Sequence, residues 1–507
     1  MGGSISDSLD KVDPGMAWSP WQPDKANPFD LKWAGHLYRR TTFGVGFDKL
    51  RAAVDMGFEA TLDEILKGEV GVANDYYTRE RMALKMFEER QMMPGEMQDP
   101  FELQVWWFTL LFNTLHPLRE KMTLFWHNHF CSSIAKVKNG KLMLLQNMLL
   151  RKYALSKFGP FLQAMTADPA LLIYLDSNDN KKGNPNENYA REVMELFSLG
   201  VGNYTEQDIR EAARAFTGWH TEGEEFYFNA REHDRGVKKF LGKEGNWKGD
   251  DIVRIILQQP AVADFIVRKT YRFLVSEIDP PAALLAPLAE SFRKSNYDIA
   301  LLVSTILRSR LFFSDHAYRK RIKSPVEFVV GTVKTFMFGD WPVPENALVT
   351  KLEAMGQLIM APPNVKGWPG GTTWLNTSTI LARHNFAYVA SSGFWPENTR
   401  NGSFLDRIVP EEEKKETPSD DPPRFEEEPD PPGKSDVATY LRNLKIRDPE
   451  LVVKRLLDLL LQGPVSEKSH RALVAFLSEG KPQGRYHSTR VRDTAHAIMT
   501  MPEYQLA

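Results

Sequence analysis

Histidine and carboxylate side chains, the groups that bind metal ions and transfer protons, lie in three stretches of this sequence. They occur at residues 119–130, 184–219 and 233–234. A mixed set of imidazoles and carboxylates suits Zn, Mn or Fe, and a water bound to such an ion can become a nucleophile. The candidate metal ligands are His127, His129, Glu192, Glu195, His233 and Asp234.

Three of these six residues could act directly on a substrate. His129, Glu192 and His233 are the candidate catalytic residues, one from each stretch. Metal-assisted hydrolysis is the least specific reaction class that they support. Other polar residues near them could orient the substrate or support the ligands. These are Asn186, Asn188, Arg191, Arg210 and Arg214.

The stretch 119–130 predicts a helix on which the two histidines diverge. His129 falls between Met122 and Phe125 on the apolar side, and His127 falls roughly opposite, with Glu120. Residues two apart share a face on a strand but not on a helix. Either the helix frays at its end or only one ring reaches a site. His129 is then a hydrogen-bonded core histidine or a ligand.

The stretch 184–219 predicts two amphipathic helices that form a hairpin. The first covers 187–199 and ends at glycines, and the second begins at Thr205, with Asp208 as a capping partner. Glu192 and Glu195 place two negative charges close together on the polar face of the first helix. Arg210 and Arg214 place two positive charges close together on the polar face of the second helix. In one interpretation, the glutamate pair and the arginine pair neutralise each other or are solvated. In the other, a metal ion or a substrate lies against the glutamates.

Two arginines near the N-terminus raise a separate question. Arg39 and Arg40 follow each other on a helix that is expected to end near Gly44. Such residues are usually solvated or paired at the surface, and an anion site is the alternative.

The pattern along the chain predicts a mainly α protein with one large multi-helix domain. We expect an irregular segment at 1–30, a helical domain at 31–408 and further helices packing on it at 437–507. The alternation of Phe226 and Phe228 predicts a short strand or β-hairpin near 225–245. Residues 410–436 contain eleven acidic side chains and seven prolines, so 409–436 should be a disordered acidic linker.

Composition excludes several classes of protein. The single cysteine, Cys131, rules out an internal disulfide framework. With 64 basic and 66 acidic residues, nothing indicates nucleic acid. No apolar run is long enough to span a bilayer, and no signal peptide is visible, so a cytoplasmic location is the default. The common nucleotide-binding loops, the serine elbow and the H-E-x-x-H zinc motif are absent.

Six stretches together resemble the bacterial family DUF1800, whose function is unknown. They are HLYRRTTFG (36–44), REKMTLFWHNHF (119–130), the whole of 184–219, HDRGVKKFLG (233–242), KSPVEFVVG (323–331) and MGQLIMAPPNVKGWPGG (355–371). The resemblance implies one elaborate helical domain and supplies no reaction. It also implies export and a partner of the DUF1501 family. This chain shows no signal peptide, which argues against export. The alternative is that a partner protein carries the chain across the membrane.

Two functions from different classes therefore remain open. The first is a metal-dependent hydrolase whose histidines and carboxylates converge beside the central hairpin. The second is a non-catalytic helical scaffold that binds a partner protein or a polysaccharide, with the polar residues forming a buried ion-pair network.

Overall fold

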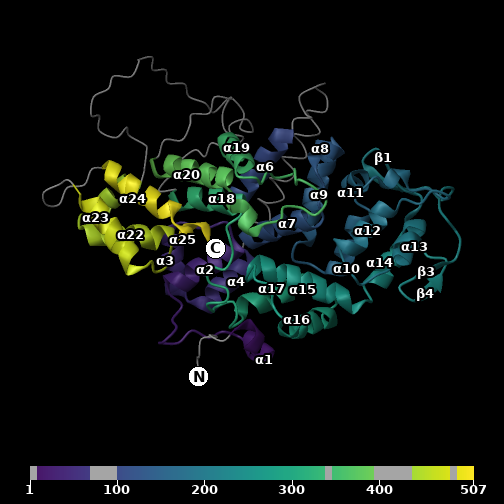
Figure 1. Ribbon diagram of the computed structural model, residues 1–507, viewed down its shortest axis with the longest axis horizontal. Helices are drawn as coiled ribbons and strands as arrows, with labels where there is room; N and C mark the ends of the chain where they lie inside the picture. The colour runs from purple at the N-terminus through teal and green to yellow at the C-terminus, as the bar shows by residue number, and fades with distance from the viewer. Residues whose placement is uncertain (1–7, 69–99, 337–344, 393–436, 480–487) are drawn as a thin grey trace, which may run out of the picture.

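The computed structural model describes residues 8–68, 100–336, 345–392, 437–479 and 488–507, and they form a mainly helical protein (Figure 1). This confirms the predicted fold class. The acidic stretch 409–436 lies outside the described residues. None of the described helices combines the length and the hydropathy that crossing a membrane requires.

The part of the chain before the central hairpin supplies short and medium helices. They are α1 (Pro14–Trp18), α2 (Leu31–Thr41), α3 (Phe47–Met56), α4 (Phe58–Lys67), α6 (Pro100–Asn113), α7 (Pro117–His129), α8 (Ile134–Val137), α9 (Gly140–Tyr153), α10 (Phe158–Thr166) and α11 (Pro169–Tyr174). Single 3₁₀ turns occupy Leu9–Lys11 (η1) and Ser177–Asp179 (η2). Within 1–30, which we expect to be irregular, the described residues thus include η1 and α1.

The rest of the chain adds the hairpin and the helices that pack around it. These are α12 (Glu187–Glu195), α13 (Glu206–Phe216), α14 (Gly249–Ile256), α15 (Pro260–Leu274), α16 (Ala282–Lys294), α17 (Ile299–Arg308), α18 (Pro325–Phe336), α19 (Glu345–Ala354), η3 (Gly371–Leu375), α20 (Thr377–Ser392), α21 (Val437–Asn443), α22 (Pro449–Leu460), α23 (Glu467–Ser478), α24 (Ser488–Thr500) and α25 (Pro502–Gln505).

Two small antiparallel strand pairs follow α13. β1 (Trp219–Glu222) pairs with β2 (Glu225–Phe228), and β3 (Lys238–Phe240) pairs with β4 (Lys243–Gly245). This confirms the short β structure predicted near 225–245. Residue Trp219 belongs to β1 rather than to the preceding helix, because the chain turns at Gly218, where φ is +82°.

The hairpin forms for the reasons that the sequence indicates, with shorter helices than expected. The Asn186 side chain caps α12, and Thr205 and Asp208 form a reciprocal capping box at α13. α12 ends at Glu195 rather than at residue 199, since the chain tightens into turns that lead to Gly200, where φ is +77°.

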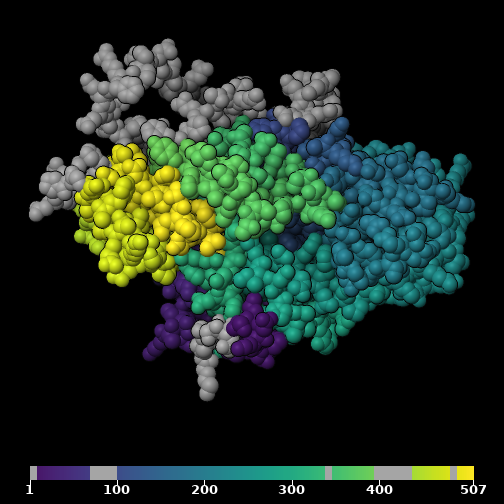
Figure 2. Space-filling view, viewed as in Figure 1, coloured from purple at the N-terminus to yellow at the C-terminus, as the bar shows by residue number. Residues whose placement is uncertain are grey.

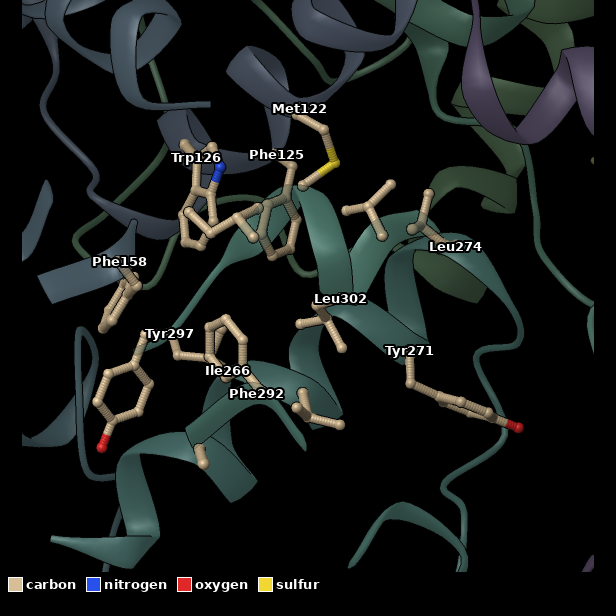
Figure 3. Close-up of a cluster of buried hydrophobic side chains, with 14 of the residues drawn as sticks. Met122, Phe125, Trp126, Phe158, Ile266, Tyr271, Leu274, Phe292, Tyr297 and Leu302 are labelled. Atoms are coloured by element: carbon tan, nitrogen blue, oxygen red, sulfur yellow. The ribbon is translucent and has the colours of Figure 1, made fainter. Parts of the chain in front are cut away.

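Among the described residues, two large apolar cores hold the molecule together, beside a small cluster of Ile322, Trp368 and Trp374. One joins α1 to α4 with α10 and α12 to α17, and the other joins α6 with α18 to α25. α7, α9 and α11 contribute side chains to both cores. Figure 3 shows Met122, Phe125 and Trp126 of α7 directed into the first core, toward side chains of α15 to α17. Polar groups on α7 are therefore buried between the two cores.

The C-terminal helices lie directly against the rest of the protein. α24 packs on α20, and the last residues return to the segment before α18. The Lys323 backbone N–H donates to the Gln505 carbonyl at 2.8 Å, and the Tyr504 and Thr332 hydroxyls are 2.8 Å apart. In Figure 1 these helices, drawn in yellow, lie beside α18 and α20.

Candidate active site

His129, the last residue of α7, is a buried histidine with both ring nitrogens engaged. Lys269 of α15 donates from Nζ to Nδ1 at 3.0 Å, so Nε2 carries the proton and donates to the Phe197 carbonyl at 3.0 Å. Burial and the nearby Lys269 charge hold the pKa of His129 well below its ordinary value. The ring is thus a neutral imidazole of fixed tautomer.

Lys269 is a functional candidate that sequence reasoning missed. Its Nζ also donates to the Leu196 carbonyl at 3.1 Å and lies 4.7 Å from the centre of the Phe265 ring. Removal from water lowers the pKa of Lys269 to about 8, so a sizeable fraction of the amine is neutral near physiological pH. In the sequence this lysine is one of several polar residues on an amphipathic helix, and nothing there singles it out.

The two glutamates of α12 have different surroundings. Glu195 accepts a hydrogen bond from the Tyr204 hydroxyl at 2.8 Å. The Glu192 carboxylate is half-buried, and no described residue hydrogen-bonds or ion-pairs with it. Burial and then the charge of Glu195 raise the pKa of Glu192, while the positive charges of Lys366 and Arg191 oppose this rise. Glu192 is therefore a carboxyl group that no structural contact uses.

Lys366 belongs to a loop that is fixed over the end of α7. The Asn128 side chain accepts from the Trp368 N–H at 2.7 Å and donates to the Trp368 carbonyl at 3.3 Å. Gly367 has φ +79°, and a Cβ there would lie 2.2 Å from Asn128 Oδ1 and 2.9 Å from Cys131 Sγ. Only glycine permits this approach, so the backbone of the loop is held close to α7.

His127 lies under the same loop, on the other side of α7 from His129. Its ring packs against Trp107 and Trp368, with centroids 5.1 and 5.6 Å away. Nε2 has no hydrogen-bond partner among the described residues, and burial lowers the pKa of His127 to about 3. α7 stays helical through His129, so the two imidazoles diverge as the helical projection predicts.

Glu192, Lys366, His129 and Lys269 make up what we call the central site. The Lys366 charge lowers the pKa of Glu192, and the Lys269 charge opposes the rise that burial causes in the pKa of the Cys131 thiol. Cys131 in turn touches the loop at Gly367. Figure 2 shows a hollow in the middle of this face, where α7, in dark blue, lies between the green 355–376 region and the teal helices.

His233 and Asp234 lie elsewhere, against the end of α13. The His233 Nδ1–H donates to the Thr217 carbonyl at 3.0 Å, and its buried Nε2 has no partner among the described residues. Arg214 donates to both carboxylate oxygens of Asp234, at 2.8 and 3.3 Å, and also to Glu211 at 2.7 Å. These contacts fasten the turn after β2 to α13.

The remaining predicted residues have structural partners or face solvent. Arg191 forks onto Glu206 at 2.9 and 2.8 Å, and Arg210 donates to Gln207 at 3.1 Å. Asn186 caps α12, and Asn188 is exposed. Neither Arg210 nor Arg214 pairs with Glu192 or Glu195, so the two like-charged pairs do not neutralise each other.

The structure therefore brings some predicted residues together and separates others. His129, with Lys269, lies against the end of α12, the helix of Glu192 and Glu195, whereas His233 and Asp234 belong to a second polar cluster on α13. In the ranges that the structure describes, no three His, Cys, Asp or Glu side chains are placed to hold a metal ion.

Comparison with known families identifies the class of protein. The family described as "Protein of unknown function (DUF1800)" matches residues 36–506, which is nearly the whole chain. The chain belongs to this family, as the six motif stretches predict, and the match includes the C-terminal helices. Searches of curated proteins and of solved structures give no match.

Proposed function

We propose that this protein is a hydrolase-type enzyme in which Glu192 transfers protons. The observation that carries the proposal is the half-buried Glu192 carboxyl, which has a raised pKa and no hydrogen bond or ion pair within the described structure. A carboxyl group with a raised pKa can serve as a general acid or base near neutral pH. By contrast, Glu195 and Asp234 are both engaged in structural contacts.

The other residues of the central site supply complementary groups. Lys366, an exposed lysine whose charge lowers the pKa of Glu192, would hold an anionic oxygen of the substrate. Lys269 provides an amine with a pKa of about 8, which His129 and the Leu196 carbonyl keep in place. A second proton-transfer group thus lies in the same part of the molecule.

A divalent ion, Zn, Mn or Fe, belongs to this proposal as an optional component. Glu192 is the carboxylate of the central site that has no partner among the described residues, and the substrate or water would supply the remaining ligands. Elemental analysis of protein purified without chelator measures this directly. Activity that survives dialysis against chelator would assign the chemistry to the protein side chains alone.

The test is hydrolysis of p-nitrophenyl esters, phosphates and glycosides by the full chain. We expect turnover of at least one class, and a loss of about 100-fold or more in Glu192→Gln, the usual contribution of a general acid or base. Glu192→Asp should retain part of the activity. Glu187→Gln, on the same helix, is the control and should behave as wild type.

Two results would contradict the proposal. One is full activity in a folded Glu192→Gln variant. The other is the absence of turnover for every substrate class by the folded wild-type protein.

A second candidate function is a non-catalytic helical scaffold that binds a partner protein or a polysaccharide. The observation that favours it is the second polar cluster, where Arg214, Asp234 and Glu211 form an ion-pair network that stabilises structure. The family membership suggests a DUF1501 protein as the partner. Co-elution of the two purified proteins, unchanged by Glu192→Gln, would support this function over catalysis.

A further inference from the structure

Buried and half-buried cations gather where α2, α7 and α18 meet the last residues of the chain. α2 supplies Arg39 and Arg40, α7 supplies Lys121, and the segment that leads into α18 supplies Arg321 and Lys323. Arg40 and Lys121 are fully buried. Taking a charge out of water is costly unless the charge is paired, so this cluster requires an explanation.

Glu327, the carboxylate in the middle of the cluster, is already saturated. It lies 2.6 Å from Lys121 Nζ and accepts two hydrogen bonds at 3.2 Å from Arg321, with a further one at 2.8 Å from the Ser324 N–H. Burial alone would raise the pKa of Glu327, but Arg321 and Lys121 together hold it far below its ordinary value. Glu327 thus compensates Lys121 and Arg321, and Glu277, whose charge acts on Arg321 and Arg40, is the other carboxylate nearby.

In the described ranges, Lys323, Arg39 and Arg40 form no ion pair with a carboxylate, although the charge of Glu327 acts on Lys323 and Arg40. Lys323 Nζ lies 3.9 Å from the centre of the Tyr504 ring, and no described carboxylate pairs with it. Arg39 donates from Nη1 to the Gln462 side chain, while its buried Nη2 has no hydrogen-bond partner of normal geometry in the described ranges. Arg40 donates from Nη2 to the Ala317 carbonyl at 2.6 Å and leaves Nε and Nη1 without partners there.

Lys323 and Arg39 both line a small cavity. It has a volume of about 40 Å³, and Arg39, Lys323, Tyr38, Thr42, Thr335 and Tyr504 are among its lining residues. Glu327 also lines it, with its charge already compensated as described above. The volume is enough for a few water-sized groups.

We propose that this cavity, which we call the α2–α18 pocket, binds a small inorganic oxyanion of the phosphate or sulfate type. A guanidinium offers two parallel N–H donors to such an ion, and a lysine adds a point charge. The pocket is distinct from the central site and is independent of the proposed hydrolase function. The proposal takes up the anion-site alternative that Arg39 and Arg40 pose in the sequence, with Arg39 as the residue that lines the pocket.

The experiment is calorimetric titration of the full chain with inorganic phosphate and sulfate at constant ionic strength, set with sodium chloride. We expect saturable binding of about one ion per chain. Lys323→Met should weaken it at least tenfold. Lys320→Met, which removes an exposed lysine three residues away, should leave it unchanged.

A second variant and a second ligand test the α2–α18 pocket further. If Lys323→Met does not fold, Arg39→Gln should show the same tenfold loss. Phosphoserine should bind more weakly than phosphate, because its substituent adds bulk at the cavity. The proposal is overturned if phosphate and sulfate give no saturable heat, if chloride competes equally well at the same concentration, if phosphoserine binds as tightly, or if the folded Lys323→Met protein binds like wild type.

Discussion

At the scale of single residues, His127 shows how burial controls a titratable group. The ring is almost fully buried between two tryptophans, and its pKa is lowered to about 3 by burial alone. The folded state therefore binds this proton less well than the unfolded state, whose histidine titrates near 6.5. The stability that neutral His127 contributes is fully present above about pH 6.5 and is lost as the pH falls toward 3.

We expect the variant His127→Phe to resist acid better than the wild-type protein. Between pH 7 and pH 5 the wild type should lose about 2 kcal/mol more than the variant, because each pH unit below about 6.5 corresponds to about 1.36 kcal/mol. Urea denaturation at the two pH values measures the difference. His470→Phe, at a partly exposed position, is the control, and an equal pH response of wild type and His127→Phe would refute the prediction.

The residue types of the candidate site could be predicted from the sequence, but their partners could not. Lys269 lies 140 residues from His129, and Asn128 lies 240 residues from Trp368. Contacts across such separations depend on how helices pack, which hydrophobic periodicity does not specify. The sequence thus indicates His129 and Glu192 without Lys269 or Lys366, and it groups them with His233, which belongs to another cluster.

At the scale of elements, the first residue of α13 is set mainly by the local sequence. Thr205 and Asp208 bond to each other's backbone N–H at 3.2 and 2.8 Å, as the capping-box pattern predicts. The ends of α12 and α13 were harder to predict, since they depend on turns through Gly200 and Gly218 that close against the rest of the protein. For Gly218, a Cβ would lie 2.4 Å from the Asn229 carbonyl oxygen.

Removing the cap should loosen the first turn of α13 without unfolding the protein. For Thr205→Ala we expect a loss of about 1 kcal/mol in local stability, which corresponds to roughly fivefold faster amide exchange in that turn. Hydrogen–deuterium exchange read at the peptides of α13 measures it. Thr205→Ser keeps the hydroxyl and should exchange at the wild-type rate, and equal exchange in Thr205→Ala would show that the cap contributes nothing.

At the scale of the whole molecule, Glu327 connects parts of the chain that are far apart in sequence. It pairs with Lys121 on α7 and Arg321 before α18, and Lys121 also donates to the Thr42 carbonyl after α2 at 2.7 Å. All three charged side chains are buried or nearly so. Breaking such a pair costs far more than the pair itself contributes, because a buried charge is left without compensation.

The substitution Glu327→Gln should therefore destabilise the whole protein by about 3–5 kcal/mol. The thermal unfolding midpoint, monitored by circular dichroism, is the measurement. Glu290→Gln, which removes an exposed ion pair with Lys294, should leave the midpoint unchanged. Similar midpoints for the two variants would mean that the buried network contributes little to the stability of the protein.

The position of α7 has a consequence for how the molecule comes apart. Leu124 belongs to one core, whereas Met122 and Trp126 belong to the other, and α9 and α11 are shared in the same way. Unfolding of either core would expose apolar side chains of these helices to water. Neither core should therefore unfold while the other stays folded. The chain should consequently behave as one cooperative unit, and a fragment cut between the cores would be prone to aggregation.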